Sequence, residues 1–112
     1  MTYEPFDVVI VPFPFTDAAQ TKRRPALVLS QNTNLGNKIG HSILAMITSL
    51  KNAPWPLDCE IKSSESGLTA PSVVRMKLFT LDNRFIIRKI GYLSEDDQKQ
   101  VTQSLSQIFD YL

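Results

Sequence analysis

Residues 7–30 read DVVIVPFPFTDAAQTKRRPALVLS, two apolar runs on either side of a polar, turn-rich segment. The first run, residues 8–13, is rich in β-branched side chains, which favour strands. Pro12 and Pro14 limit this run, because proline cannot donate a hydrogen bond to a sheet ladder. The second run covers residues 26–30. The pattern predicts two strands and places a basic tract (KRR) where the second strand begins.

Residues 31–40, which follow the second run, are rich in Asn and Gly, and this composition predicts a long polar loop. The NAPWP sequence at residues 52–56 breaks the chain again, because each proline fixes its own φ and restricts the residue before it. Short strands at regular spacing, bounded by Pro and Gly turns, predict a small barrel or sandwich. The remaining predicted strands are residues 42–48, 57–61, 72–75 and 85–93.

The last segment of the chain has the pattern of one amphipathic helix. Ser94 is a good N-cap, and the acidic residues 95–97 suit the positive end of the helix dipole. The sequence therefore predicts a mainly β fold with a C-terminal helix that buries an apolar stripe on the sheet or on another subunit. The stripe consists of Val101, Leu105, Ile108, Phe109 and Leu112.

Length and composition exclude several classes of protein. A chain of 112 residues with 43% hydrophobic and 21% charged residues is expected to form one domain, residues 1–112. The formal net charge is +1, so a site for a polyanion has to come from local clusters of basic residues. The single Cys59 excludes an internal disulfide and fits a reducing compartment. Neither a signal peptide nor an apolar run of the roughly 20 residues needed to span a bilayer is present, so a cytoplasmic location is expected.

Residues that bind metals or nucleotide cofactors are scarce. His41 is the single histidine, so a paired-histidine mechanism cannot be built within one chain, and a surface position is expected for it. The His, Cys, Asp and Glu residues show no ligand spacing, and the glycines form no phosphate-binding loop. We therefore expect neither a metal nor a cofactor.

Arg24 and Thr48 are the strongest candidates for chemistry. Arg24 begins the second predicted strand and Thr48 ends the third, so their side chains share a rim if these strands are antiparallel neighbours. A guanidinium binds phosphate through two parallel charge-assisted hydrogen bonds, and a hydroxyl can donate another. On residue types alone, a surface ion pair for Arg24 and a β-forming role for Thr48 are the more frequent interpretation.

The aromatic residues also have two interpretations. Aromatic side chains in grooves can stack on splayed bases, but packing in the core or in a dimer is the more frequent role. This expectation of packing applies to Phe13, Phe15, Trp55 and Phe85. Arg88 and Lys89 are expected at a solvated strand edge.

Residues 7–17, followed by residues 22–30, resemble the N-terminal signature of the MazF/PemK toxins of type II toxin–antitoxin systems. The similarity covers almost the whole chain in order. It continues through AMITS (45–49), WPL (55–57), GLTAPSVV (67–74), LFTLD (78–82) and IGYL (90–93).

The resemblance implies a CcdB/PemK-like fold, a small SH3-like β-barrel with a C-terminal helix, usually found as a homodimer. It implies a metal- and ribosome-independent endoribonuclease that cuts single-stranded RNA within short sequences and leaves a 2′,3′-cyclic phosphate and a 5′-hydroxyl. A cognate antitoxin is the implied partner. The essential Arg and Thr of the family correspond to Arg24 and Thr48. Contacts with RNA are implied for Thr16, Gln20, Lys22, Arg23, Ser49 and Lys77.

In this chemistry Arg24 would stabilise the charge of the phosphorane and could protonate the leaving 5′-oxygen, while Thr48 would orient the phosphate. A guanidinium is a poor general base, so the base stays unassigned. Because the reaction needs a 2′-hydroxyl, the enzyme would not cleave DNA. Some family members carry Gln-Ile-Arg where this chain has residues 77–79 (KLF), so the cleavage sequence stays open.

The alternative function is that of a non-cleaving relative on the same fold, either a poison of DNA gyrase or a nucleic-acid-binding module. The last three residues, 110–112 (DYL), differ from the Trp-Gly-Ile end of the gyrase-poisoning branch. Because Arg24 and Thr48 are also retained, cleavage of RNA is favoured.

Overall fold

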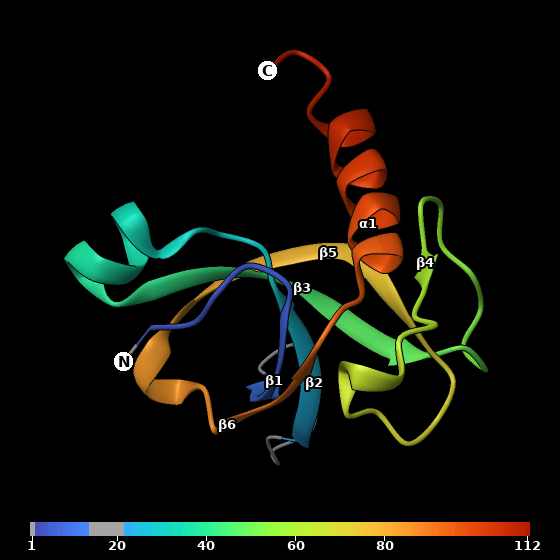
Figure 1. The fold of residues 1–112 in the computed structure, drawn as a ribbon, viewed down its shortest axis with the longest axis horizontal. Helices are drawn as coiled ribbons and strands as arrows, with labels where there is room; N and C mark the ends of the chain where they lie inside the picture. Colours follow the sequence, from blue (N-terminus) through green and yellow to red (C-terminus); the bar gives the residue numbers. More distant parts are fainter. Residues whose placement is uncertain (1, 14–21) are drawn as a thin grey trace.

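The computed structural model describes residues 2–13 and 22–112 of the chain (Figure 1). Within this part, six antiparallel strands form one sheet in the order β4-β5-β3-β2-β1-β6, and one α-helix, α1 (Glu95–Ile108), follows the last strand. The predicted mainly β fold with a C-terminal helix is confirmed. The strands are β1 (Asp7–Phe13), β2 (Lys22–Val28), β3 (His41–Ser49), β4 (Cys59–Glu60), β5 (Ser72–Asp82) and β6 (Arg88–Tyr92).

Successive side chains of a strand point to opposite faces of the sheet, and here both faces carry buried apolar residues. One face packs against α1. Its core contains Val8, Leu27, Ala45, Ile47 and Val74 together with Leu93 and Val101. The opposite face carries a second core, which contains Val9, Val11, Ala26, Val28 and Leu44 together with Tyr3 and Ile86.

Two glycines bring the edge strand β6 against the segment that follows β4. A Cβ atom on Gly67, which has a φ of 76°, would lie 2.1 Å from the carbonyl oxygen of Ile90. A Cβ atom on Gly91 would lie 2.2 Å from the carbonyl oxygen of Glu65. Because β4 and β6 are the two ends of the strand order, this approach of backbone to backbone curls the sheet toward a barrel.

The prediction of a polar loop at residues 31–40 is wrong. Residues Asn32–Ile39 form a wide π-helical segment, η1, instead. Gly40 ends this segment in the left-handed conformation, with a φ of 68°, and its N–H donates to carbonyl oxygens of the last turn. The side chain of Asn32 also donates to Glu4 at 3.2 Å, so the Asn and Gly residues that suggested a loop build the ends of a helical turn.

Four predicted strands differ in extent from the structure by more than one residue. The strand expected at residues 26–30 is β2, which begins earlier, at Lys22, and ends at Val28, so Arg24 lies within it. The strand expected at residues 57–61 is limited to β4 (Cys59–Glu60), because Leu57 has a φ of 68° and belongs to a turn. The strand expected at 72–75 extends to Asp82, because β3 provides pairing partners along its whole length across a bulge. The strand expected at 85–93 begins at Arg88, since residues Asn83–Phe85 form a short 3₁₀ turn, η3.

Helix α1 begins as expected and buries part of its stripe. The Ser94 hydroxyl accepts a hydrogen bond from the backbone N–H of Asp97 at 3.3 Å, which confirms the N-cap. Val101 is buried and Leu105 packs beside it, but Leu112 is 92% exposed and lies beyond the last turn. Figure 1 shows the C-terminal half of α1 projecting away from the sheet.

Asp97 joins α1 to the segment after β4. Its buried carboxylate accepts from the backbone N–H groups of Lys62 at 3.0 Å and of Ser63 at 2.8 Å. Its partners therefore belong to another element. In a capping box, by contrast, the side-chain oxygen at the third helical position accepts from the backbone N–H of the N-cap residue. This carboxylate fixes the start of the helix to the sheet.

Replacing Asp97 by alanine is expected to lower the free energy of unfolding by about 2–4 kcal/mol, because two backbone N–H groups lose a charged acceptor. Asp97→Asn keeps one acceptor oxygen and is expected to cost about 1 kcal/mol. Urea unfolding at one fixed protein concentration measures both losses. Asp96→Ala, at an exposed position in the same turn, is the control, and an equal loss in Asp96→Ala and Asp97→Ala would contradict the role assigned to Asp97.

Candidate active site

The pairing of β2 with β3 places Arg24 beside Thr48. The two strands are antiparallel, with Ala26 opposite Met46 and Leu27 opposite Ala45. Continuing this register by two residues sets Arg24 opposite Thr48. Because both positions are an even number of residues from the Ala26–Met46 pair, both side chains lie on the opposite face of the sheet, away from α1. The shared rim expected from the sequence therefore agrees with the strand register.

The Arg24 side chain has an unused hydrogen-bond donor. Among the residues that the structure describes, its Nε is the one buried side-chain nitrogen or oxygen without a hydrogen-bond partner. An unpaired buried donor costs about 1–3 kcal/mol, so native structures rarely retain one without a function. A phosphate oxygen would satisfy this donor, and a guanidinium that faces a phosphate has further N–H groups for the same anion.

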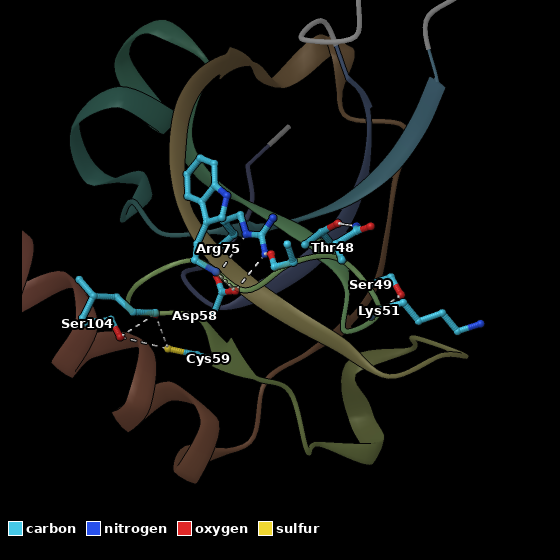
Figure 2. Close-up of polar contacts among 11 residues, drawn as sticks. Thr48, Ser49, Lys51, Asp58, Cys59, Arg75 and Ser104 are labelled. Atoms are coloured by element: carbon cyan, nitrogen blue, oxygen red, sulfur yellow. Dashed lines mark hydrogen bonds and ion pairs between the residues drawn. The ribbon is translucent and has the colours of Figure 1, made fainter.

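The Thr48 hydroxyl is held in a fixed orientation. Thr48 is 5% exposed, and its Oγ1 accepts a hydrogen bond of 2.6 Å from the side-chain amide of Asn52. Since Asn52 supplies the proton of that bond, the hydroxyl keeps its own proton free to donate. Figure 2 shows Thr48 near the end of its strand, beside the turn that leads to Lys51. Asn52 was not foreseen from the sequence, where it looked like one polar residue of a turn.

Four of the six other expected RNA contacts lie in the described residues and fall into two groups. By strand alternation, Lys22 and Lys77 lie on the same face of the sheet as Arg24. By the same alternation, Arg23 and Ser49 lie on the opposite face of the sheet. The Ser49 hydroxyl accepts a hydrogen bond from the backbone N–H of Lys51 at 3.1 Å. Thr16 and Gln20 lie outside the described residues. The RNA contacts of all six residues stay predictions.

A buried ion pair lies next to Thr48 on the neighbouring strand. Arg75 of β5 is opposite Met46, and its guanidinium donates to Asp58 through Nε at 3.2 Å and through Nη2 at 3.0 Å (Figure 2). Nη2 also donates to the carbonyl oxygen of Ala53 at 2.8 Å. The side chains of the pair are 8% and 12% exposed, so water screens their attraction weakly.

The Asp58 carboxyl stays ionised in this environment. Its burial alone would raise its pKa, but hydrogen bonds from Arg75 and from the backbone N–H of Trp55, together with the guanidinium charge, hold the pKa below its usual range. The pair therefore carries no net charge at neutral pH. Arg75 acts as a support for the loop 50–58 and does not add to the positive charge that would attract a phosphate.

Two of the four aromatic residues expected in the core or in a dimer are exposed. Trp55 is 45% exposed and Phe85 is 56% exposed, so the expectation of core packing is wrong for both. Dimer packing stays a prediction for them. No side-chain position is described for Phe13 and Phe15.

Two further residues singled out from the sequence, His41 and Lys89, lie away from the candidate site. His41 begins β3, at the opposite end of that strand from Thr48, and its Nδ1 is 2.8 Å from the carbonyl oxygen of Ile39. Lys89 of the edge strand β6 is exposed, as expected, and its Nζ is 3.0 Å from Asp7. Within the described ranges, no three His, Cys, Asp or Glu side chains gather in a way that could hold a metal ion. Among the helices in residues 2–13 and 22–112, none has both the length and the apolar character of a membrane span.

Comparison with known proteins identifies the family. The model of the family described as "PemK-like, MazF-like toxin of type II toxin-antitoxin system" matches residues 4–109. Among solved structures, Mycobacterium tuberculosis toxin MazF-mt6 is similar, with 22% identity and a TM-score of 0.73 over 93% of this chain and 96% of that one. The MazE–MazF structure (Form-III) from Deinococcus radiodurans matches with 22% identity and a TM-score of 0.77 over 98% of each chain.

A third structure is an endoribonuclease in complex with its cognate antitoxin from a mycobacterial species. It matches with 13% identity and a TM-score of 0.75 over 97% of this chain and 94% of that one. At such identities the likeness of the three structures establishes the fold, so the predicted CcdB/PemK-like fold is confirmed. The family match extends over both candidate active-site strands and helix α1, and the chain belongs to the PemK-like, MazF-like toxin family of type II toxin–antitoxin systems.

Proposed function

We propose that this toxin is an endoribonuclease that cleaves single-stranded messenger RNA within short sequences, at a site built from Arg24 and Thr48. The observation that carries the proposal is the unpaired, buried Nε of Arg24 on the same sheet face as the Thr48 hydroxyl. Two hydrogen-bond donors on one face of the sheet suit a tetrahedral anion whose charge rises during the reaction. The phosphodiester of RNA, which gains charge as the phosphorane forms, is such an anion.

The reaction is a transphosphorylation. The 2′-oxygen of the ribose attacks the adjacent phosphorus, its proton leaves to a base, and the bond from phosphorus to the 5′-oxygen breaks. The 5′-oxygen takes up a proton, so the products are a 2′,3′-cyclic phosphate and a 5′-hydroxyl. In this proposal Arg24 stabilises the charge on the phosphorane and delivers the proton to the 5′-oxygen, and Thr48 donates a hydrogen bond to a phosphate oxygen.

The proposed partners follow from the family. A cognate antitoxin neutralises the toxin, as in the similar MazE–MazF and endoribonuclease–antitoxin structures. Two copies of the chain form a homodimer, and the protein acts in the cytoplasm. An apolar groove between the C-terminal half of α1 and the sheet is available for packing against the antitoxin or against the second copy. It is lined by Leu29, Ile43, Leu78, Leu105, Phe109 and Leu112.

Purified protein incubated with a long single-stranded RNA in EDTA is expected to give discrete fragments. Each upstream fragment is expected to end in a cyclic phosphate, because the attacking group is the neighbouring 2′-hydroxyl. A substrate with 2′-deoxyribose at a mapped cleavage site is expected to stay intact at that site. Intact RNA together with trapped gyrase–DNA complexes would instead indicate a gyrase poison.

Arg24→Ala is expected to lower kcat/KM for RNA by about 10²- to 10³-fold, because one preorganised charged donor is lost. Arg24→Met, which keeps the length of the side chain, is expected to lose activity to the same extent without loss of stability. Its free energy of unfolding should be unchanged or higher, since the unpaired Nε no longer has to be buried. An Arg24→Met variant that unfolds more easily would show that Arg24 is structural.

Thr48→Val removes a hydroxyl and keeps the branched shape of the side chain. The expected loss in kcat/KM is about 10- to 100-fold, as for one hydrogen bond to a charged group. Thr48→Ser keeps the hydroxyl and is expected to retain most of the activity, and initial rates on a short RNA measure both. Equal losses in Thr48→Val and Thr48→Ser would mean that packing of the methyl group, and not the hydroxyl, is what the site needs.

A further inference from the structure

Trp55 is the single tryptophan of the chain, and one of its faces is already covered. The guanidinium carbon of Arg75 lies over the indole, 5.0 Å from the ring centroid. The residue is nevertheless 45% exposed. Its exposed surface therefore belongs to the ring edge and to the face turned away from Arg75, so the ring offers one free π-face to solvent.

The support under the ring is rigid. Arg75 is 7% exposed and is held by Asp58 and by the carbonyl oxygen of Ala53, so its guanidinium cannot move away from the indole at low cost. Asp58 also accepts from the backbone N–H of Trp55 at 2.9 Å. The same carboxylate therefore fixes both the backbone of Trp55 and the cation beneath its ring.

The backbone of Trp55 is restrained as well. Trp55–Asp58 forms a tight turn, in which the Asp58 N–H donates to the Trp55 carbonyl oxygen at 3.3 Å. Pro54 and Pro56 flank the tryptophan, and Pro56 restricts the conformation of the residue before it. Leu57 takes the left-handed position of the turn, with a φ of 68°, where glycine is usual. Backbone strain of this kind persists only where the surroundings impose it, and it often marks functional sites.

This platform lies next to the candidate active site. On β3 and β5, Thr48 is opposite Val73 and Met46 is opposite Arg75, so Arg75 is the diagonal neighbour of Thr48 on the same sheet face. The loop that carries Trp55 is also tied to Thr48 directly, since Asn52 donates to its hydroxyl at 2.6 Å. The loop that carries Trp55 is thus next to the proposed phosphate position, on the side of β5.

We propose that Trp55 is a stacking platform for the base of a nucleotide adjacent to the scissile phosphate. The inference rests on the proposed endoribonuclease function and adds a second contact for the same RNA. Bases of single-stranded RNA stack on aromatic side chains, and a ring that is already immobilised loses little conformational freedom when it binds. Every base has a π-face, so Trp55 fixes the position of the nucleotide and leaves the choice of base to other side chains.

The single tryptophan allows a direct test. The probe is a 2′-O-methyl RNA oligonucleotide that spans a cleavage site mapped on long RNA; it cannot be cut, because the attacking hydroxyl is blocked. Titration of the wild-type protein with this probe is expected to quench the fluorescence of Trp55. Replacing the bases one at a time by abasic positions is expected to abolish the quenching at one position next to the cleavage site. Quenching that survives every abasic replacement would overturn the inference.

Kinetics on a cleavable RNA provide the second measurement. Trp55→Leu is expected to lower kcat/KM by about 5- to 100-fold, while Trp55→Phe, which keeps a π-face, should stay within about 3-fold of wild type. Phe85→Leu is the matched control, because Phe85 is an exposed aromatic residue at the other end of β5, and its kcat/KM should not change. Urea unfolding of the three variants separates loss of contact from loss of fold.

The outcomes distinguish the two proposals. If wild type cuts RNA but Trp55→Leu is as active as wild type, the stacking role is wrong and the proposed function stands. The stacking role is also wrong if Trp55→Leu weakens only the binding of an antitoxin or of a second copy, since the free π-face then belongs to a protein interface. If wild type does not cut RNA, both proposals fall together.

Discussion

The antiparallel register of β3 with its two neighbours is the constraint on which the site depends. It sets Thr48 across from Arg24 on one side and diagonal to Arg75 on the other. A shift by one residue would turn Thr48 toward α1 and bring an apolar side chain to the other face. Because both faces of the sheet carry a buried core, such a shift would place polar groups in apolar contacts on both sides. The two cores therefore fix the register, and the register aligns the three side chains.

The same region retains features that reduce stability. The Nε of Arg24 is buried without a partner, Leu57 occupies a left-handed conformation, and Arg75 and Asp58 are withdrawn from water as an ion pair. A buried ion pair is often no more stable than apolar residues of the same volume. All three features lie on β2 and β5 or in the loop that follows β3. Phe6, which precedes β1, also has a left-handed φ of 71°, so backbone strain is not confined to this region. The unpaired donor and the buried ion pair beside Thr48 are nevertheless what function would require and stability alone would not.

Much of the fold was predictable from the sequence, because apolar runs and turn residues mark β1, β2, β3 and the capped helix α1. The failures have physical causes. Residues 31–40 have a loop composition, yet one glycine in a left-handed position ends a helical turn there. β5 was foreseen only up to Arg75, whereas its pairing with β3 shifts register opposite Ala45 and Met46 and then continues to Asp82. Local propensity does not report such tertiary pairing.

For the site, the sequence indicated residue types but not their partners. Arg24 and Thr48 were identifiable by motif, whereas Asn52 and the pairing of Arg75 with Asp58 depend on contacts between residues that only the folded sheet brings together. This difference also bears on specificity. Neither a guanidinium that binds a phosphate nor an indole that stacks on a base distinguishes one base from another. Recognition of a short RNA sequence therefore requires side chains that reach base edges, and these have to come from other elements around the site.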